Sequence, residues 1–137
     1  MKPRIAILIS GGGSNMISLV NAIKYNKINA LPAIVISNNS NAAGLDKAAE
    51  LKIPTRYIDH RKFSGNREAF EKRLHSLLQD EKIDIICLAG FMRILTKSFI
   101  DQWNNKILNI HPSLLPKYKG LNTHQRAIDA YDEISGC

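Results

Sequence analysis

The chain has 137 residues, which suits one ordinary domain and leaves no room for two. Hydrophobic residues make up 45% of it and charged residues 23%, a globular balance that argues against disorder. No apolar run reaches the roughly 18 residues of a membrane span. The first apolar run, Ile5–Ile9, is too short for a signal peptide, so we expect a cytoplasmic protein that is not bound to a membrane.

Lysine and arginine outnumber aspartate and glutamate by 19 to 12, which gives a formal net charge of +7 and favours anionic partners. The basic residues are scattered, whereas a nucleic-acid groove needs a concentrated stripe, so we predict a small anionic substrate and no nucleic acid. Cys87 and Cys137 are far apart and suggest no disulfide framework. Three of the histidines, His60, His75 and His124, show no metal-ligand spacing, so we expect no metal site.

Short β-branched runs alternate with helical patterns along the chain. The predicted strands are Arg4–Ile9, Ala33–Ser37, Thr55–Ile58, Ile83–Leu88 and Ile107–Ile110. The predicted helices are Asn15–Tyr25, Gly44–Lys52, Asn66–Asp80, Lys97–Trp103 and Thr123–Tyr131. The second, fourth and fifth strands are almost wholly apolar, as expected for parallel strands covered on both faces, and Cys87 should be buried in the fourth.

This alternation predicts an α/β fold with an open, mostly parallel, doubly wound sheet. In such sheets, ligands bind beyond the carboxyl ends of the strands, where the strand order reverses. We therefore expect Ser10–Asn15, Ala89–Leu95 and Asn109–Pro112 to converge there. The chain stops at Cys137 just after a predicted helix, with no element to close the sheet. We interpret residues 1–137 as a single domain that is incomplete at its C-terminal end.

The segment Gly11–Asn15 is a glycine loop that leads into a helix. Its glycines permit a tight turn with consecutive exposed N–H groups, and the positive end of the helix, capped by Ser14, points at the same place. That combination is typical of a phosphate site. The loop lacks the Gly-Lys-Ser/Thr ending of a P-loop and has Met16 where a dinucleotide site needs glycine, so a monophosphate is favoured over ATP or NAD. The alternative is a tight turn without a ligand.

The segment Asn109–Pro112 carries an amide and an imidazole two residues apart on a strand. Residues i and i+2 of a strand point the same way, and Pro112 ends the pairing, so Asn109 and His111 should face one volume. Both can donate to a carbonyl oxygen that becomes an oxyanion, and the imidazole can move a proton. This pattern favours acyl-transfer catalysis; the alternative is a structural histidine.

Two further features remain open at this level. The apolar segment Leu88–Leu95 is either core packing or the wall of a pocket for a flat ring. Arg67, near the start of a predicted helix, either pairs with a ligand carboxylate or is simply solvated.

Taken together, Ser10–Asn15, Leu88–Leu95 and Leu108–Pro116 followed by Gly120 resemble the phosphoribosylglycinamide (GAR) formyltransferases of purine biosynthesis, along the whole chain. The resemblance implies a Rossmann-like formyltransferase fold. It also implies a reaction in which the amine of GAR attacks the formyl group of 10-formyltetrahydrofolate, giving formyl-GAR and tetrahydrofolate.

By position, the resemblance also implies roles for individual residues. Asn109 and His111 would be catalytic. Gly13, Ser14 and Asn15 would hold the GAR phosphate through main-chain donors. The folate would contact Arg67, Met92, Arg93, Ile94, Leu95 and Asn109. The family aspartate that orients the histidine would follow Cys137, so we expect the complete protein to continue and the piece alone to be nearly inactive.

Three alternatives to this assignment remain at the level of the sequence. Formyltetrahydrofolate deformylase and methionyl-tRNA formyltransferase share the Asn-x-His strand end. The non-enzymatic alternative is a phosphate-binding module without turnover.

Overall fold

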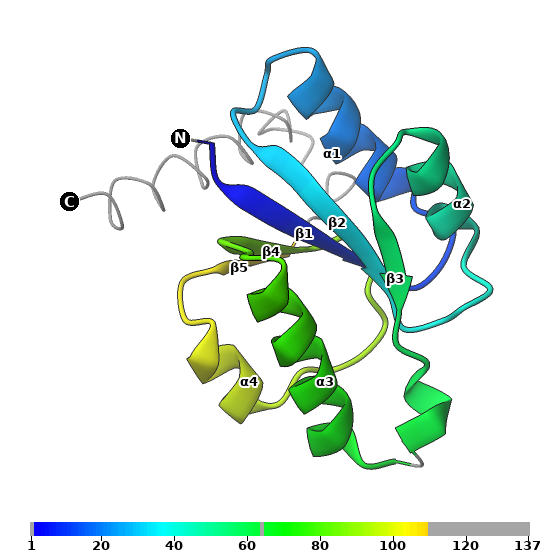
Figure 1. Cartoon of the computed structure of the whole chain (residues 1–137), viewed down its shortest axis with the longest axis vertical. Helices are drawn as coiled ribbons and strands as arrows, with labels where there is room; N and C mark the ends of the chain where they lie inside the picture. Colours follow the sequence, from blue (N-terminus) through cyan, green and yellow to red (C-terminus); the bar gives the residue numbers. More distant parts are fainter. Residues whose placement is uncertain (1, 64, 110–137) are drawn as a thin grey trace.

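The computed structural model describes residues 2–63 and 65–109 and contains one five-stranded sheet with helices on both faces (Figure 1). The strands are β1 (Arg4–Ile9), β2 (Leu31–Ser37), β3 (Thr55–Tyr57), β4 (Ile85–Leu88) and β5 (Ile107–Asn109). Their order is β3-β2-β1-β4-β5, and every pairing is parallel. The predicted parallel doubly wound sheet is therefore confirmed, and the strands differ from the predicted ones only at their ends.

The helices are α1 (Ser14–Lys24), α2 (Ala43–Glu50), α3 (Arg67–Asp80) and α4 (Lys97–Gln102). A short 3-10 helix, η1 (His60–Phe63), follows β3 and was not predicted. The predicted helix Thr123–Tyr131 lies outside the described residues. Within residues 2–63 and 65–109, no helix combines the length and the apolar character needed to cross a membrane.

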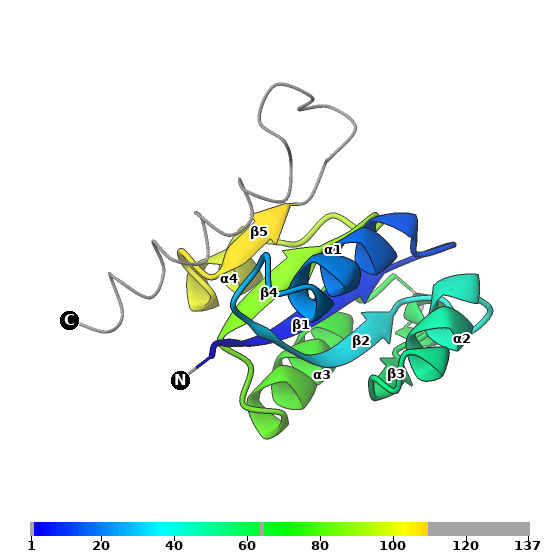
Figure 2. The same ribbon diagram turned by 90° about the horizontal axis from the view of Figure 1, so that it is seen from above.

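Two apolar layers sandwich the sheet, with α1 and α2 on one face and α3 and α4 on the other (Figures 1 and 2). Side chains of a strand alternate between the faces, so Ile5, Ile7 and Ile9 of β1 pack under α1 and α2. Ala6 and Leu8 pack under α3 and α4. All five are fully buried, which explains why β1 reads as a continuous apolar run.

The strand order reverses between β1 and β4. The chain moves from β1 to β2 and β3 on one side, then crosses back to place β4 and β5 on the other side. The carboxyl ends of β1 and β4 therefore lie next to each other, with their connections leaving toward opposite faces of the sheet. This is the place where the sequence predicts a ligand.

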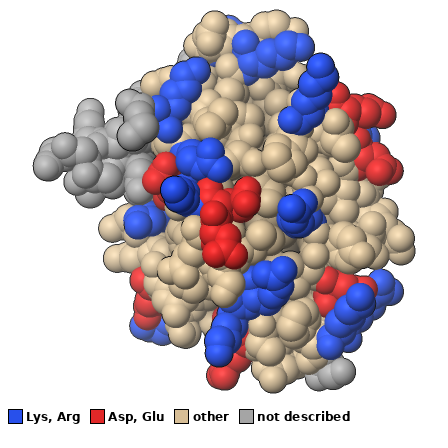
Figure 3. Space-filling view, viewed as in Figure 1, with Lys and Arg blue, Asp and Glu red and all other residues tan. Residues whose placement is uncertain are grey.

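On the face drawn in Figure 3, lysine and arginine side chains are spread over the surface with acidic side chains among them. Among the described residues, exposed Lys97 and Asp101 form an ion pair, with 2.9 Å between Nζ and Oδ2. Exposed pairs of this kind contribute little to stability, about 0–1 kcal/mol.

Two glycines bring α2 against the loop that follows β1. The Gly44 N–H donates to the Gly11 carbonyl at 3.0 Å. A Cβ on Gly44 would lie 2.5 Å from Cδ1 of Ile9, 3.0 Å from the Gly11 oxygen and 3.1 Å from Cα of Gly13. The close approach of α2 thus depends on the absence of a side chain at residue 44.

We expect Gly44→Ala to lower the free energy of unfolding by about 1–3 kcal/mol, because the added methyl overpacks a contact made largely with backbone. Denaturant unfolding measures the change. The matched control is Gly12→Ala, whose Cβ would meet nothing within 4 Å in the part of the chain that the structure describes. Equal stability of the two variants would contradict the packing argument.

Cys87 lies in β4 within the layer under α1 and α2 and is fully buried, as predicted. Burial raises the pKa of its thiol to about 12, because the charged thiolate is poorly solvated there.

We therefore expect the native protein to show no alkylation of the Cys87 peptide by iodoacetamide at about pH 8, since only the thiolate reacts. Peptide mass spectrometry measures the labelling, with denatured protein as the positive control. Equal labelling rates in the two states would show that the thiol is accessible.

Candidate functional site

Segments that are far apart in the sequence meet at the carboxyl edge of the sheet. As β4 ends, the Ala89 N–H donates to the Leu8 carbonyl at 2.9 Å. The Met92 N–H then donates to Oγ of Ser10 at 2.7 Å. Leu88 at the end of β4 is paired with Asn109 at the end of β5. The convergence predicted from the sequence is thus present for the described residues, whereas His111 lies outside them.

The glycine loop after β1 is open on one side and supported by α2 on the other. Gly11 and Gly12 are exposed, and a Cβ on either would meet no atom of the described residues within 4 Å. The Gly11 carbonyl accepts from the Gly44 N–H, and the Gly12 carbonyl accepts from Nζ of Lys47 at 2.9 Å. With its carbonyl groups occupied by α2, the loop leaves an open surface for a ligand that accepts hydrogen bonds.

The start of α1 supplies donors at the same place. The N–H groups in the first turn of a helix have no partner inside the helix and carry a partial positive charge. The first turn of α1 contains no acidic residue, so no side chain of that turn neutralises this charge. Loop and helix together form a surface suited to an anion such as a phosphate.

The capping residue differs from the prediction. Gly13 occupies the N-cap position in a left-handed conformation with φ 79°, and Ser14 is the first residue of the helix. The Gly13 carbonyl accepts from the Ile17 N–H at 2.9 Å, and the N-cap residue, a glycine, makes no side-chain cap bond. The prediction that Ser14 caps α1 is therefore wrong. The tight turn ends one residue earlier, because glycine adopts a positive φ without strain.

The segment Leu88–Leu95, for which the sequence left open core packing or a pocket wall, is partly core and partly exposed. Phe91 and Leu95 are half-buried against the layer under α3 and α4, so part of the segment is core. The side chains of Met92 and Ile94 are 77% and 75% exposed. Two large apolar residues of this segment are therefore exposed, and exposed apolar surface is what a pocket for a flat ring would use.

Helix α3 holds this segment at its far end. Glu71 is only 6% exposed, and its carboxylate accepts from the Thr96 N–H at 2.7 Å and from the Thr96 hydroxyl. The guanidinium of Arg93 lies 5.7 Å from the ring centre of Phe70, a cation–π distance. Sequence reasoning missed Glu71. A charged residue beside Phe70 on the apolar face of α3 was the signal that could have found it.

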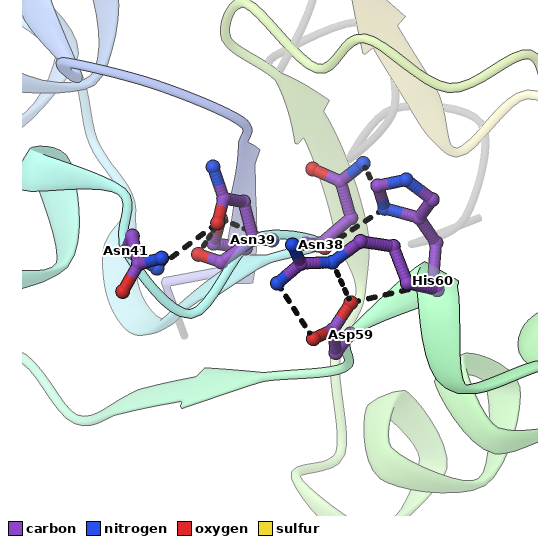
Figure 4. Close-up of polar contacts among 7 residues, drawn as sticks. Asn38, Asn39, Asn41, Asp59 and His60 are labelled. Atoms are coloured by element: carbon purple, nitrogen blue, oxygen red, sulfur yellow. Dashed lines mark hydrogen bonds and ion pairs between the residues drawn. The ribbon is translucent and has the colours of Figure 1, made fainter.

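A second buried polar group lies at the ends of β2 and β3. Asn38 is 4% exposed, and its Oδ1 accepts from the Ser10 hydroxyl at 2.6 Å. Figure 4 shows the Asn38 amide facing His60, whose Nδ1 lies 3.3 Å from Nδ2 of Asn38. Next to His60, Asp59 accepts two hydrogen bonds from the Arg61 side chain, each 3.0 Å long. These bonds hold the pKa of the Asp59 carboxyl below its ordinary value.

The remaining predicted site residues lie around this edge. Asn109 is exposed at the end of β5. Arg67 is the exposed first residue of α3, one helical turn before Glu71.

His75 is half-buried on α3, and its Nδ1 accepts from the Trp103 indole N–H at 3.0 Å. Among the described residues, no three His, Cys, Asp or Glu side chains gather as metal ligands would.

The arrangement defines an open parallel α/β protein with a candidate anion loop and an apolar loop at its switch point. Residues 3–137 match the model of the formyl transferase family, and the chain therefore belongs to that family. The family resemblance predicted from the sequence is confirmed.

Among known proteins, the chain is 47% identical over 133 residues to a phosphoribosylglycinamide formyltransferase of Haemophilus influenzae, covering 97% of this chain and 62% of that protein. It is 48% identical over 136 residues to the trifunctional purine biosynthetic protein adenosine-3 of Bos taurus, covering 99% of this chain and 13% of that protein. A phosphoribosylglycinamide formyltransferase from Brucella melitensis is similar in structure, with a TM-score of 0.78 and 45% identity over 95% of this chain and 67% of that one. The chain thus spans less than two thirds of the length of either of these two sequence relatives.

We expect Glu71→Gln to lower the free energy of unfolding by about 1–2 kcal/mol. The amide offers one acceptor oxygen where the carboxylate offers two, so one of the two Thr96 groups loses its partner. Denaturant unfolding measures the effect, with the exposed Glu68→Gln, one turn earlier on α3, as the matched control. A loss no larger than that of the control would mean that Glu71 does not hold the loop.

Proposed function

We propose that this protein transfers a formyl group from 10-formyltetrahydrofolate to the amine of 5-phosphoribosylglycinamide, giving formyl-GAR and tetrahydrofolate in purine biosynthesis. The observation that carries the proposal is the pairing of an open anion loop with an exposed apolar loop at one sheet edge. Relatives named phosphoribosylglycinamide formyltransferase support it. We infer a cytoplasmic location from that pathway.

The phosphate of GAR would bind at Gly13, Ser14 and Asn15 through main-chain N–H groups. The open faces of Gly11 and Gly12 support this assignment, because no described residue would lie within 4 Å of a Cβ on either glycine. The uncompensated positive end of α1 adds favourable electrostatics for a dianion. A binding mode that uses the main chain needs no basic side chain in the loop.

The folate would bind along Met92, Arg93, Ile94 and Leu95, with Arg67 and Asn109 as further contacts. The residues fit a flat ring with a polar edge. Met92 and Ile94 offer exposed apolar surface, while the backbone of the loop is held by Ser10 and Glu71. When bound, 10-formyltetrahydrofolate supplies the formyl group.

Asn109 and His111 would be the catalytic residues. The carboxamide of Asn109 ends β5 in the exposed position that a hydrogen-bond donor to the formyl oxygen needs. Such donors, fixed before the reaction, stabilise the negative charge that develops on that oxygen. His111 lies outside the described residues, and its proposed role, donating to the same oxygen and moving a proton, comes from the Asn-x-His spacing.

The test is formyl transfer by the purified full-length protein, with GAR as acceptor and 10-formyltetrahydrofolate as donor, followed by folate absorbance. We expect Asn109→Ala and His111→Ala to lower kcat by roughly 10²- to 10³-fold, because each removes a donor to the developing oxyanion. The control is Asn104→Ala, an exposed asparagine in the turn between α4 and β5.

Other outcomes would point elsewhere. Donor consumption without GAR would indicate a deformylase, and transfer to methionyl-tRNA but not to GAR would indicate the tRNA enzyme. Binding of GAR without turnover would indicate a phosphate-binding module.

A further inference from the structure

Ser10 lies between the two candidate binding loops and touches both. It directly precedes Gly11, the first residue of the glycine loop. Its Oγ also lies 2.7 Å from the main-chain nitrogen of Met92, an exposed apolar residue of the second loop. These two residues are separated by 82 positions in the sequence, so the contact exists only in the folded protein.

The direction of each hydrogen bond follows from the groups involved. A main-chain N–H can only donate, so Oγ of Ser10 accepts from Met92. The single hydroxyl hydrogen of Ser10 is then free to be donated to Oδ1 of Asn38, 2.6 Å away. Asn38 therefore orients the hydroxyl so that its lone pair faces Met92.

Asn38 is itself held in place. Its side chain is buried, and Nδ1 of His60 lies 3.3 Å from its Nδ2 and 3.1 Å from its main-chain oxygen. A buried amide that is packed in this way cannot turn without leaving a polar group unpaired, which costs about 1–3 kcal/mol. The hydroxyl of Ser10 consequently donates to the fixed side chain of Asn38 and accepts from the main-chain N–H of Met92.

We propose that Ser10 and Asn38 are positioning residues that fix the loop for the formyl donor relative to the loop for the acceptor phosphate. The assignment of the two loops rests on the proposed function. Neither residue needs to touch a substrate, because the effect passes through the Met92 main chain. Their loss should therefore weaken use of the formyl donor and leave the phosphate loop, which α2 supports independently, almost unchanged.

We expect Ser10→Ala to raise the KM for 10-formyltetrahydrofolate about three- to tenfold, the equivalent of one net hydrogen bond. The KM for GAR should change less than about twofold. Ser10→Thr retains the hydroxyl and should restore the donor KM. The matched control is Ser18→Ala, whose exposed hydroxyl bonds within α1 to the Ser14 carbonyl at 3.2 Å.

A double-mutant cycle separates positioning from general destabilisation. Asn38→Ala should raise the donor KM in the same direction, and the double variant with Ser10→Ala should show no further rise, since both act through one N–H group. Equal increases in both KM values, additive effects, or a Ser10→Ala profile like that of Ser18→Ala would overturn the proposal.

Amide hydrogen exchange of the peptide spanning residues 88–95 gives a readout that does not require activity. We expect faster exchange there in Ser10→Ala than in Ser18→Ala, because the Met92 N–H loses its acceptor. If the parent protein transfers no formyl group, the proposed function fails. Hydrogen exchange then decides separately whether the hydrogen bond from Met92 to Ser10 holds the loop. Unchanged exchange in Ser10→Ala would refute that role of the hydrogen bond, whatever the activity.

Discussion

The burial of β1 on both faces is the constraint on which the rest of the structure depends. Its side chains from Ile5 to Ile9 are fully buried, and each large one contributes about 1.5–3 kcal/mol only if both faces are covered. Helices on both faces require the chain to wind outward in both directions from β1. The reversal of strand order beside β1 follows from this requirement. At that reversal two connections leave toward opposite faces of the sheet, and a ligand can enter between them.

Polar side chains buried beneath the loops fix this edge. A buried carboxylate or amide is costly unless it is hydrogen-bonded, and Glu71 and Asn38 meet that condition through Thr96 and Ser10. The second loop is held at its main chain, through the N–H groups of Met92 and Thr96. Its backbone is thus fixed while the apolar side chains at residues 92 and 94 stay available for contact, the arrangement that a preorganised binding surface needs.

The geometry of the candidate anion loop suits an anion without charged side chains in the loop itself. The positive end of α1, equivalent to about half a unit charge, is not offset by any acidic residue in its first turn. Gly13 and Gly44 allow the loop and α2 to touch, and Lys47 adds a cation on the Gly12 carbonyl. Donors of this kind belong to the main chain, so the loop can suit a phosphate although it matches neither the P-loop nor the dinucleotide pattern.

The sequence by itself determined the parallel sheet, the position of its strands and the loops at its carboxyl edge, because apolar periodicity and glycine conformation are local properties. Tertiary structure decided which polar groups hold those loops. The pairs Ser10–Met92, Ser10–Asn38 and Glu71–Thr96 are 82, 28 and 25 residues apart, and no local pattern specifies them. The contact between His75 and Trp103 has the same origin. Hydrogen-bond partners across a fold depend on the distances that packing of the core creates, and those distances exist only after the chain has folded.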